Sequence, residues 1–235
     1  MLKPLPVSMT IEQKISLLDA IYRIYGEFIR SQPLACERSC ATCCTGNTTL
    51  TTLEGYRILS SLNAAQEQEL LTAIHHADGS KRFKPELTFN RIAELCMQGR
   101  DIPEEPMDLD RGVCALLSQL ECPVYAARPF GCRCMVSKVR CDRSGYADMD
   151  ELILSVNHLF IQYIEHIDIP GMTGNLLDVL GFLEPDSRRS AYACGRIQGT
   201  PEHLIPNAPI PVLMIPPRHR QRIQPILKSL NALLR

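Results

Sequence analysis

The nine residues 36–44, which read Cys-Glu-Arg-Ser-Cys-Ala-Thr-Cys-Cys, constrain the fold of this chain more than any other stretch. Their spacing, C-x3-C-x2-C-C, lets several sulfurs reach one ion or one inorganic cluster. In C-x2-C the backbone can turn back so that both thiolates face one centre, which is typical of zinc and iron–sulfur sites. Because neighbouring side chains diverge, the adjacent pair Cys43 and Cys44 indicates two irons of one cluster or two separate sites. The segment therefore predicts a metal centre.

Cysteine usage along the whole chain favours metal binding over disulfides. The start of the chain lacks the continuous apolar stretch of a secretory signal, and cytosolic thiols stay reduced. The chain has 11 cysteines, an odd number, and most of them fall into two groups. These groups are Cys36, Cys40, Cys43 and Cys44, then Cys114, Cys122, Cys132, Cys134 and Cys141. Cys96 and Cys194 stand apart, and we expect them to be ordinary buried thiols. We predict a soluble, cytoplasmic protein.

Charge and composition argue against several classes of partner. The formal net charge is -1, so no overall field favours nucleic acid or an anionic membrane. Trp is absent and aromatic residues make up only 6% of the chain, which leaves little basis for stacking on nucleic-acid bases. No uncharged apolar run reaches the ~20 residues of a membrane span. Metal is the expected partner, nucleic acid and membrane are not, and a protein partner or substrate stays open.

Hydrophobic periodicity and capping residues predict a mainly α fold, with little β structure, around an irregular cysteine-held metal centre. One helix is predicted from Thr10, with Gln13 as its capping-box partner, to about Ser31. Further helices are predicted over residues 51–62, 63–76, 88–99, 148–167 (capped by Asp148), 173–183 and the C-terminal stretch. Residues 184–217 are rich in Pro and Gly, and 209–217 should be extended over much of their length.

Three segments follow from this pattern. An N-terminal helix occupies residues 1–33, and a cysteine-cluster metal-binding domain occupies residues 34–145. C-terminal helices and a Pro-rich extended segment make up residues 146–235, and we expect them to pack on the same body.

The second cysteine group completes a pattern that can be compared with a known family. Residues 112–117 read Gly-Val-Cys-Ala-Leu-Leu, and residues 122–133 read Cys-Pro-Val-Tyr-Ala-Ala-Arg-Pro-Phe-Gly-Cys-Arg. Together with residues 36–44 they resemble the YkgJ-like cysteine-cluster family, with its C-x-[IV]-Y-x2-R-P-x2-C-R motif. Glu54 also matches a Glu that the family usually carries. The resemblance covers about residues 34–145 and implies a zinc- or iron-chelating domain with little defined biochemistry.

The resemblance also suggests which thiols bind metal. Eight cysteines match the family's pattern or lie beside it, and we expect them to be the ligands: Cys36, Cys40, Cys43, Cys44, Cys114, Cys122, Cys132 and Cys141. Cys134 stands where relatives usually have no cysteine, and the distance from Cys132 to Cys141 is shorter than usual. Cys134 and Cys141 therefore remain alternatives for the last ligand. The histidines are not expected to be ligands.

Two arginines near Cys132 are the expected cofactor-binding residues. A zinc ion or an oxidised four-iron cluster held by four thiolates carries net negative charge, and burying that charge requires donors or cations nearby. Arg128 and Arg133 could supply them. The alternative is a structural ion pair between Arg128 and Glu54 or another carboxylate.

Three functions remain open at this point. The first is a protein that holds an iron–sulfur cluster (4Fe-4S) or zinc through both cysteine groups, with a structural or redox role. Iron–sulfur is favoured because the thiols outnumber the four of a closed zinc site and include an adjacent pair. The second is an enzyme of methyltransferase or redox type, although no Gly-rich strand-to-helix turn is present to hold S-adenosylmethionine. The third is a labile metal-handling or redox-sensing protein.

Overall fold

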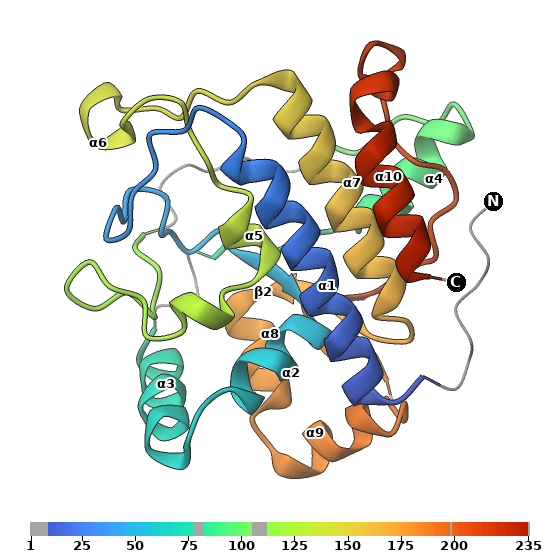
Figure 1. Ribbon diagram of the computed structural model, residues 1–235. Helices are drawn as coiled ribbons and strands as arrows, with labels where there is room; N and C mark the ends of the chain where they lie inside the picture. The colour runs from blue at the N-terminus through green and yellow to red at the C-terminus, as the bar shows by residue number, and fades with distance from the viewer. Residues whose placement is uncertain (1–8, 78–81, 105–111, 198, 235) are drawn as a thin grey trace.

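A computed structural model describes residues 9–77, 82–104, 112–197 and 199–234 (Figure 1). Over these residues the chain forms ten α-helices and one sheet of three short strands. The prediction of a mainly α fold with little β structure is confirmed.

The first four helices begin at the predicted capping residues. In α1 (Ile11–Arg30), α2 (Thr52–Ser60) and α3 (Ala64–His76), the cap and the third helical residue exchange the two hydrogen bonds of a capping box. Helix α4 (Phe89–Met97) begins after Thr88, whose side chain accepts from the Arg91 backbone N–H. These four predicted helices are confirmed, because the signals that start them are local in sequence.

The remaining elements alternate with loops. Helical segments follow at η2 (Tyr125–Ala127), α5 (Phe130–Arg133), α6 (Cys141–Ser144), α7 (Glu151–Ile167), α8 (Leu176–Leu183), α9 (Asp186–Ala193), η3 (Pro217–His219) and α10 (Arg220–Leu233). The sheet is antiparallel, in the order β1 (Thr49–Thr51), β2 (Met172–Asn175), β3 (Leu204–Pro206).

Two details of the sequence prediction were wrong. The N-cap of α7 is Asp150 and not Asp148. Residues 173–175 are a strand and not helix, because they pair with β1 on one side and β3 on the other. The Pro- and Gly-rich stretch 184–217, for which no regular element was predicted, contains α9 and β3.

The core joins the cysteine-bearing segment to the helices. Helix α7 packs against α1 and α4, and α2 packs against α8. Phe130, at the start of α5, lies 4.7 Å from Tyr25 and 5.8 Å from Phe160 between ring centroids. Phe130 is buried. The short helix that carries Cys132 is therefore anchored in the hydrophobic core.

The Pro-rich segment contacts helix α7. The Gln162 side chain on α7 donates to the Val212 carbonyl over 2.8 Å and accepts from the Met214 N–H over 2.9 Å. Helix α10 then packs against α1. Within the described parts of the chain, no helix combines the length and the apolar character that a membrane span requires.

Candidate metal centre

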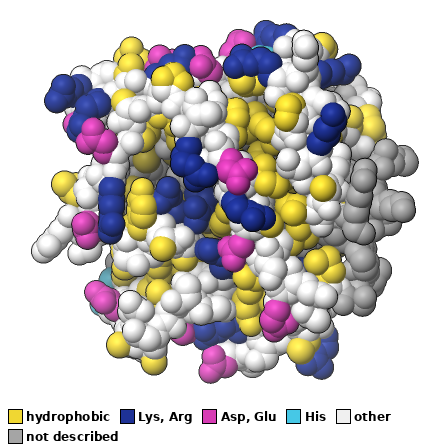
Figure 2. Space-filling view, viewed as in Figure 1, with side chains coloured by type: hydrophobic (Ala, Val, Ile, Leu, Met, Phe, Trp, Pro, Cys, Tyr) yellow, Lys and Arg dark blue, Asp and Glu magenta, His cyan; other side chains and the backbone are white. Residues whose placement is uncertain are grey.

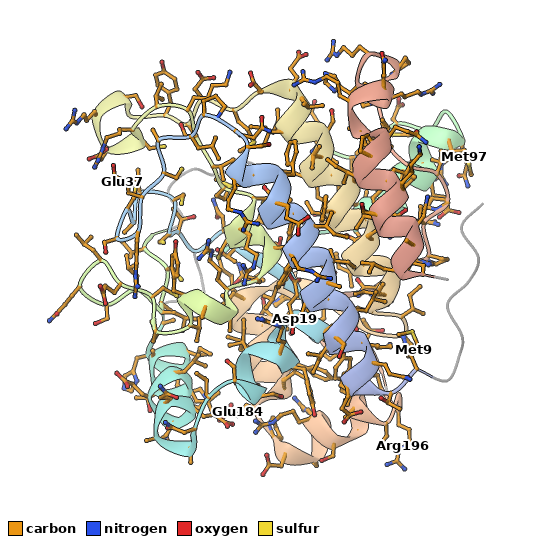
Figure 3. The ribbon with its side chains drawn as sticks, viewed as in Figure 1. Met9, Asp19, Glu37, Met97, Glu184 and Arg196 are labelled. Carbon is orange, nitrogen blue, oxygen red and sulfur yellow. The ribbon has the colours of Figure 1, made fainter. Side chains whose placement is uncertain are left out.

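The two cysteine groups lie side by side, on the side of the molecule where the long loops gather (Figure 1). Backbone hydrogen bonds join them: Ala35 N–H donates to the Ser137 carbonyl over 2.8 Å, and Cys114 N–H donates to the Cys44 carbonyl over 2.9 Å. Glu37, in the first group, and Met97, at the end of α4, lie at opposite sides of the molecule (Figure 3). The cysteine loops are thus set apart from α4.

All 11 cysteines lie within the described residues, and none of them forms a disulfide. Among those described residues, no three Cys, His, Asp or Glu side chains stand close enough together to hold a single ion. The thiols are nevertheless near enough for their charges to act on one another. We group eight of them into two sets by these interactions, which also cross between the sets, because Cys40 and Cys43 both interact with Cys44.

The first of these, the inner set, consists of Cys44, Cys114, Cys122 and Cys132. The pKa of Cys132 is raised to about 12, chiefly by burial. The other three thiols of the set also raise it, and contact with the Thr48 hydroxyl partly offsets the increase. Burial is also the main cause of the raised pKa of Cys44, where Cys114 and Cys122 add to it. The pKa of Cys114 is raised by burial first and also by Cys122. Every pair within the inner set therefore interacts.

The outer set consists of Cys36, Cys40, Cys43 and Cys141. The pKa of Cys43 is raised to about 11. Burial of its sulfur is the main cause, and the thiols of Cys44, Cys36 and Cys40 contribute. The pKa of Cys36 is raised mainly by burial, with smaller contributions from Cys141 and Cys40. The Cys36 sulfur also accepts the Ser137 N–H over 3.2 Å. As residues, Cys36 and Cys43 are exposed, whereas all four members of the inner set are half-buried.

The three other cysteines lie outside these sets. Cys134 caps the C-terminus of α5, and its thiol lies 3.4 Å from the Gly131 carbonyl. Burial raises the pKa of Cys134 to about 12. Cys132 and Cys134 therefore do not lie on one extended segment. The prediction that Cys96 and Cys194 are buried was wrong, because both are exposed at or near helix ends.

The charge of Arg128 acts on a thiol of the inner set. The Arg128 guanidinium stacks on the Tyr125 ring, 3.9 Å from its centroid, and its charge lowers the pKa of Cys122 against the larger effect of burial. Arg133 lies over the Tyr22 ring at 4.3 Å and donates to the carbonyls of Arg128 and Ala126.

Glu54 holds the cysteine-bearing helix in place. Its carboxylate accepts from the Tyr22 hydroxyl over 2.6 Å, from Thr51 N–H over 2.8 Å and from Phe130 N–H over 2.6 Å. These partners, and not Arg128, satisfy its buried charge. The last bond reaches the first residue of α5, two residues before Cys132.

Two further residues at the site were missed by sequence reasoning. The Thr48 hydroxyl lies 3.8 Å from the Cys132 sulfur, and Ser137 contacts Cys36 through its backbone. Their positions in the sequence carry no distinguishing signal, because both contacts span more than eighty residues, from 48 to 132 and from 36 to 137.

The family comparison agrees with this arrangement. Residues 35–147 match the family model CxxCxxCC, described as "Putative zinc- or iron-chelating domain". The resemblance of this segment to the cysteine-cluster family, which its motifs predicted, is therefore confirmed. Comparison with curated proteins gives no match, and comparison with solved structures gives none either.

The donors in both sets fit this description. Thiolate sulfur is a soft ligand that selects zinc and iron–sulfur clusters over magnesium or calcium. On the face drawn in Figure 2, Lys and Arg side chains lie interspersed with Asp and Glu, so neither sign of charge dominates that face. The expectation that nucleic acid is not a partner stays a prediction.

Proposed function

We propose that this chain is a cytoplasmic protein with two four-thiolate metal centres, one at the inner set and one at the outer set. The observation that carries the proposal is the mutual interaction of the four inner thiols. One of them comes from the first cysteine group and three come from the second. Such a centre joins two loops that are about seventy residues apart. Metal bound there stabilises the folded state, since the unfolded chain has no preformed site.

Two sets also account for the adjacent cysteines. Eight thiols exceed the needs of one four-coordinate centre, and Cys43 and Cys44 diverge. Cys114 and Cys122 act on Cys44, and Cys36 acts on Cys43, whereas Cys40 acts on both neighbours. The two neighbours still act on each other, as adjacent residues must. We assign them to different centres.

Iron–sulfur clusters suit these sets better than zinc. The chain offers more thiols than the four of a closed structural zinc site, and they include the adjacent pair Cys43 and Cys44. In a four-iron cluster each cysteine binds a different iron, so the sulfurs stand farther apart than around a bare zinc ion. Such a cluster supplies one-electron transfer when bound.

The two arginines have different parts in this proposal. Arg128 offsets negative charge at Cys122, as its effect on the pKa of that thiol supports. Arg133 braces the turn from Ala126 to Arg128 through its two carbonyl contacts. Burial lowers the pKa of Arg133, and the nearby charges of Tyr22 and Glu54 oppose that effect.

A structural or redox role fits better than catalysis. A cavity of about 460 Å³ lies beside Cys114, but its charged lining groups already have protein partners. Arg82 forms a two-pronged pair with Asp178, and His76 Nδ1 contacts the Thr72 carbonyl. Substrate recognition needs polar groups that converge on a ligand. A second candidate, a labile metal-handling or redox-sensing role, is favoured at the outer set alone, because Cys36 and Cys43 are exposed.

Metal and sulfide analysis after anaerobic purification tests the proposal. Two four-iron clusters predict about eight irons and as many acid-labile sulfides per chain, together with a brown colour. About two zinc ions per chain without iron would refute the clusters while leaving both sets in place. Less than one metal ion of any kind per chain would contradict the two centres themselves.

A further inference from the structure

An apolar cavity lies behind the inner set. It has a volume of about 160 Å³, is partly open to the surface, and is lined by residues of β1, β2, α2, α4, α5, α7 and the segment before α4. Its apolar lining includes Leu50, Phe83, Phe89, Ile92, Phe130 and Ile161. Glu54 and Glu165 also line it. Nothing in the metal-binding proposal makes use of this space.

Three contacts connect the cavity wall to Cys132. Phe130 and Gly131 line the cavity and immediately precede Cys132 in α5. Thr49 also lines the cavity, and its neighbour Thr48 contacts the Cys132 sulfur over 3.8 Å. Glu54 lines the cavity and accepts the Phe130 N–H over 2.6 Å. The cavity wall is thus also the support of the innermost thiol.

The backbone segments that form this wall are tightly packed. A Cβ atom built on Gly131 would stand 2.5 Å from the Thr49 carbonyl oxygen, so the backbones of α5 and β1 are in close contact. A displacement of either one is therefore passed to the other and on to Cys132. Packed interiors transmit small shifts in this way because they have low compressibility.

The size and the lining of the cavity define what it can hold. An apolar cavity of about 150 Å³ accommodates benzene, whereas a peptide segment needs far more room. Both carboxylates are already engaged: Glu165 accepts the N–H groups of Phe89 and Asn90 over 2.8 Å each, and Glu54 accepts that of Phe130. None of the described lining residues is basic, so the lining offers no cation to hold an anion. A ligand for this space is accordingly small, apolar and neutral.

We propose that this cavity binds a small neutral apolar molecule of about the size of benzene, and that its occupancy is coupled to the metal centre at the inner set. The coupling rests on the proposed function, whereas the binding of the apolar molecule does not. A ligand that makes the wall more rigid around Cys132 slows the loss of metal from the inner set. If the ligand also raises the equilibrium affinity of the inner set for metal, bound metal raises the affinity of the cavity for the ligand by the same factor.

Fluorobenzene is the probe for the cavity, observed by 19F NMR with the metal-loaded full-length protein. We expect saturable binding of one molecule per chain, about tenfold weaker or more in Ile92→Phe, which fills the space from α4. Ile226→Phe on α10 is the matched control, because Ile226 is half-buried but does not line the cavity. Benzoate should not compete. Non-saturable binding, equal binding in both variants, or full competition by benzoate would overturn the site.

Metal release tests the coupling in the same samples. We expect saturating fluorobenzene to slow the removal of metal from the inner set by a chelator about fivefold or more, with the outer set unchanged. Ile92→Phe should make the rate insensitive to fluorobenzene. Saturable binding with an unchanged release rate would overturn the coupling. A protein that binds fluorobenzene but holds no metal would overturn the proposed function and the coupling together, leaving only the cavity assignment.

Discussion

The inner and outer sets have the same donor chemistry but different surroundings. The inner set is half-buried, and its innermost thiol, Cys132, lies on a helix that Phe130 anchors in the core and Glu54 holds by its N-terminus. The outer set lies on a loop and at the start of the short helix α6, with Cys36 and Cys43 exposed and with Glu37 and Arg140 paired nearby. The comparison indicates that the structure behind a thiol, more than the spacing of the cysteines, decides whether a centre is fixed or exchangeable.

The largest expected difference between the sets is in how much metal and stability are lost when one cysteine is replaced. The two variants are Cys132→Ser for the inner set and Cys36→Ser for the outer set. Cys132→Ser should remove the inner centre entirely and lower the free energy of unfolding by several kcal/mol, because metal binding at this site is coupled to folding. Cys36→Ser should remove only the outer centre and leave the inner one bound. Metal content per chain and denaturant titration of both variants check this. Equal losses of metal and of stability in the two variants would remove the distinction between the sets.

The second prediction concerns the support of the inner set. Glu54→Gln replaces a buried carboxylate that accepts hydrogen bonds from Phe130, Thr51 and Tyr22. The NH2 group of the new amide can only donate, so at least one of these three donors loses its acceptor. We expect a loss of about 2–3 kcal/mol in unfolding free energy. Metal release from the inner set should also be faster, while release from the outer set should be unchanged.

Glu202→Gln serves as the control for this change, because the Glu202 side chain is 86% exposed. Denaturant titration and chelator kinetics measure the two effects. If Glu54→Gln accelerated release from the outer set as much as from the inner set, Glu54 would not be the specific support of α5.

The third prediction concerns pH. The pKa of each inner thiol is raised, chiefly by burial, so the metal-free thiols carry protons at neutral pH. Metal binds thiolates and must displace these protons, so affinity falls as the pH falls. For Cd2+ at the inner set we expect the logarithm of the affinity to rise by about three to four per pH unit between about pH 6.5 and 8. Competition titrations at several pH values measure this slope, and a slope near zero would mean that the thiols are already ionised.

The smallest expected effect is that of Cys134→Ala. Cys134 interacts with Cys43 and Glu54 but with no member of the inner set, and its thiol lies near the Gly131 carbonyl. We expect both centres to be retained, with a loss of stability of about 1 kcal/mol from the lost side-chain atom in a packed site. Cys96→Ser and Cys194→Ser should change neither quantity, because both residues are exposed. Loss of a centre in Cys134→Ala would make Cys134, and not Cys141, the last ligand.

Sequence reasoning was most accurate where the causes of structure are local. The capping pairs Thr10 with Gln13, and Thr51 with Glu54, start α1 and α2 at the predicted residues, because a helix N-terminus is decided within one turn. The strand at residues 172–175 was missed. Its pairing with residues 49–51 depends on a partner more than a hundred residues away.

The same distinction applies to the candidate site. The motif spacing predicted that residues 36–44 and 112–141 form one metal-binding region. It did not predict the division of the thiols, since Cys44 interacts with Cys114 and Cys132 only once the fold has joined their loops. The bond from Glu54 to Phe130 is of the same kind, because no local pattern marks a contact across 76 positions.

The assignment of Cys43 and Cys44 to different centres is tested most directly by 113Cd NMR of the cadmium-substituted protein. The wild-type protein should give two resonances of equal intensity, both in the range of cadmium bound by four thiolates. Cys43→Ser should shift or abolish one of them, and Cys44→Ser the other. A single resonance in the wild-type protein, or the same resonance lost in both variants, would contradict two separate centres.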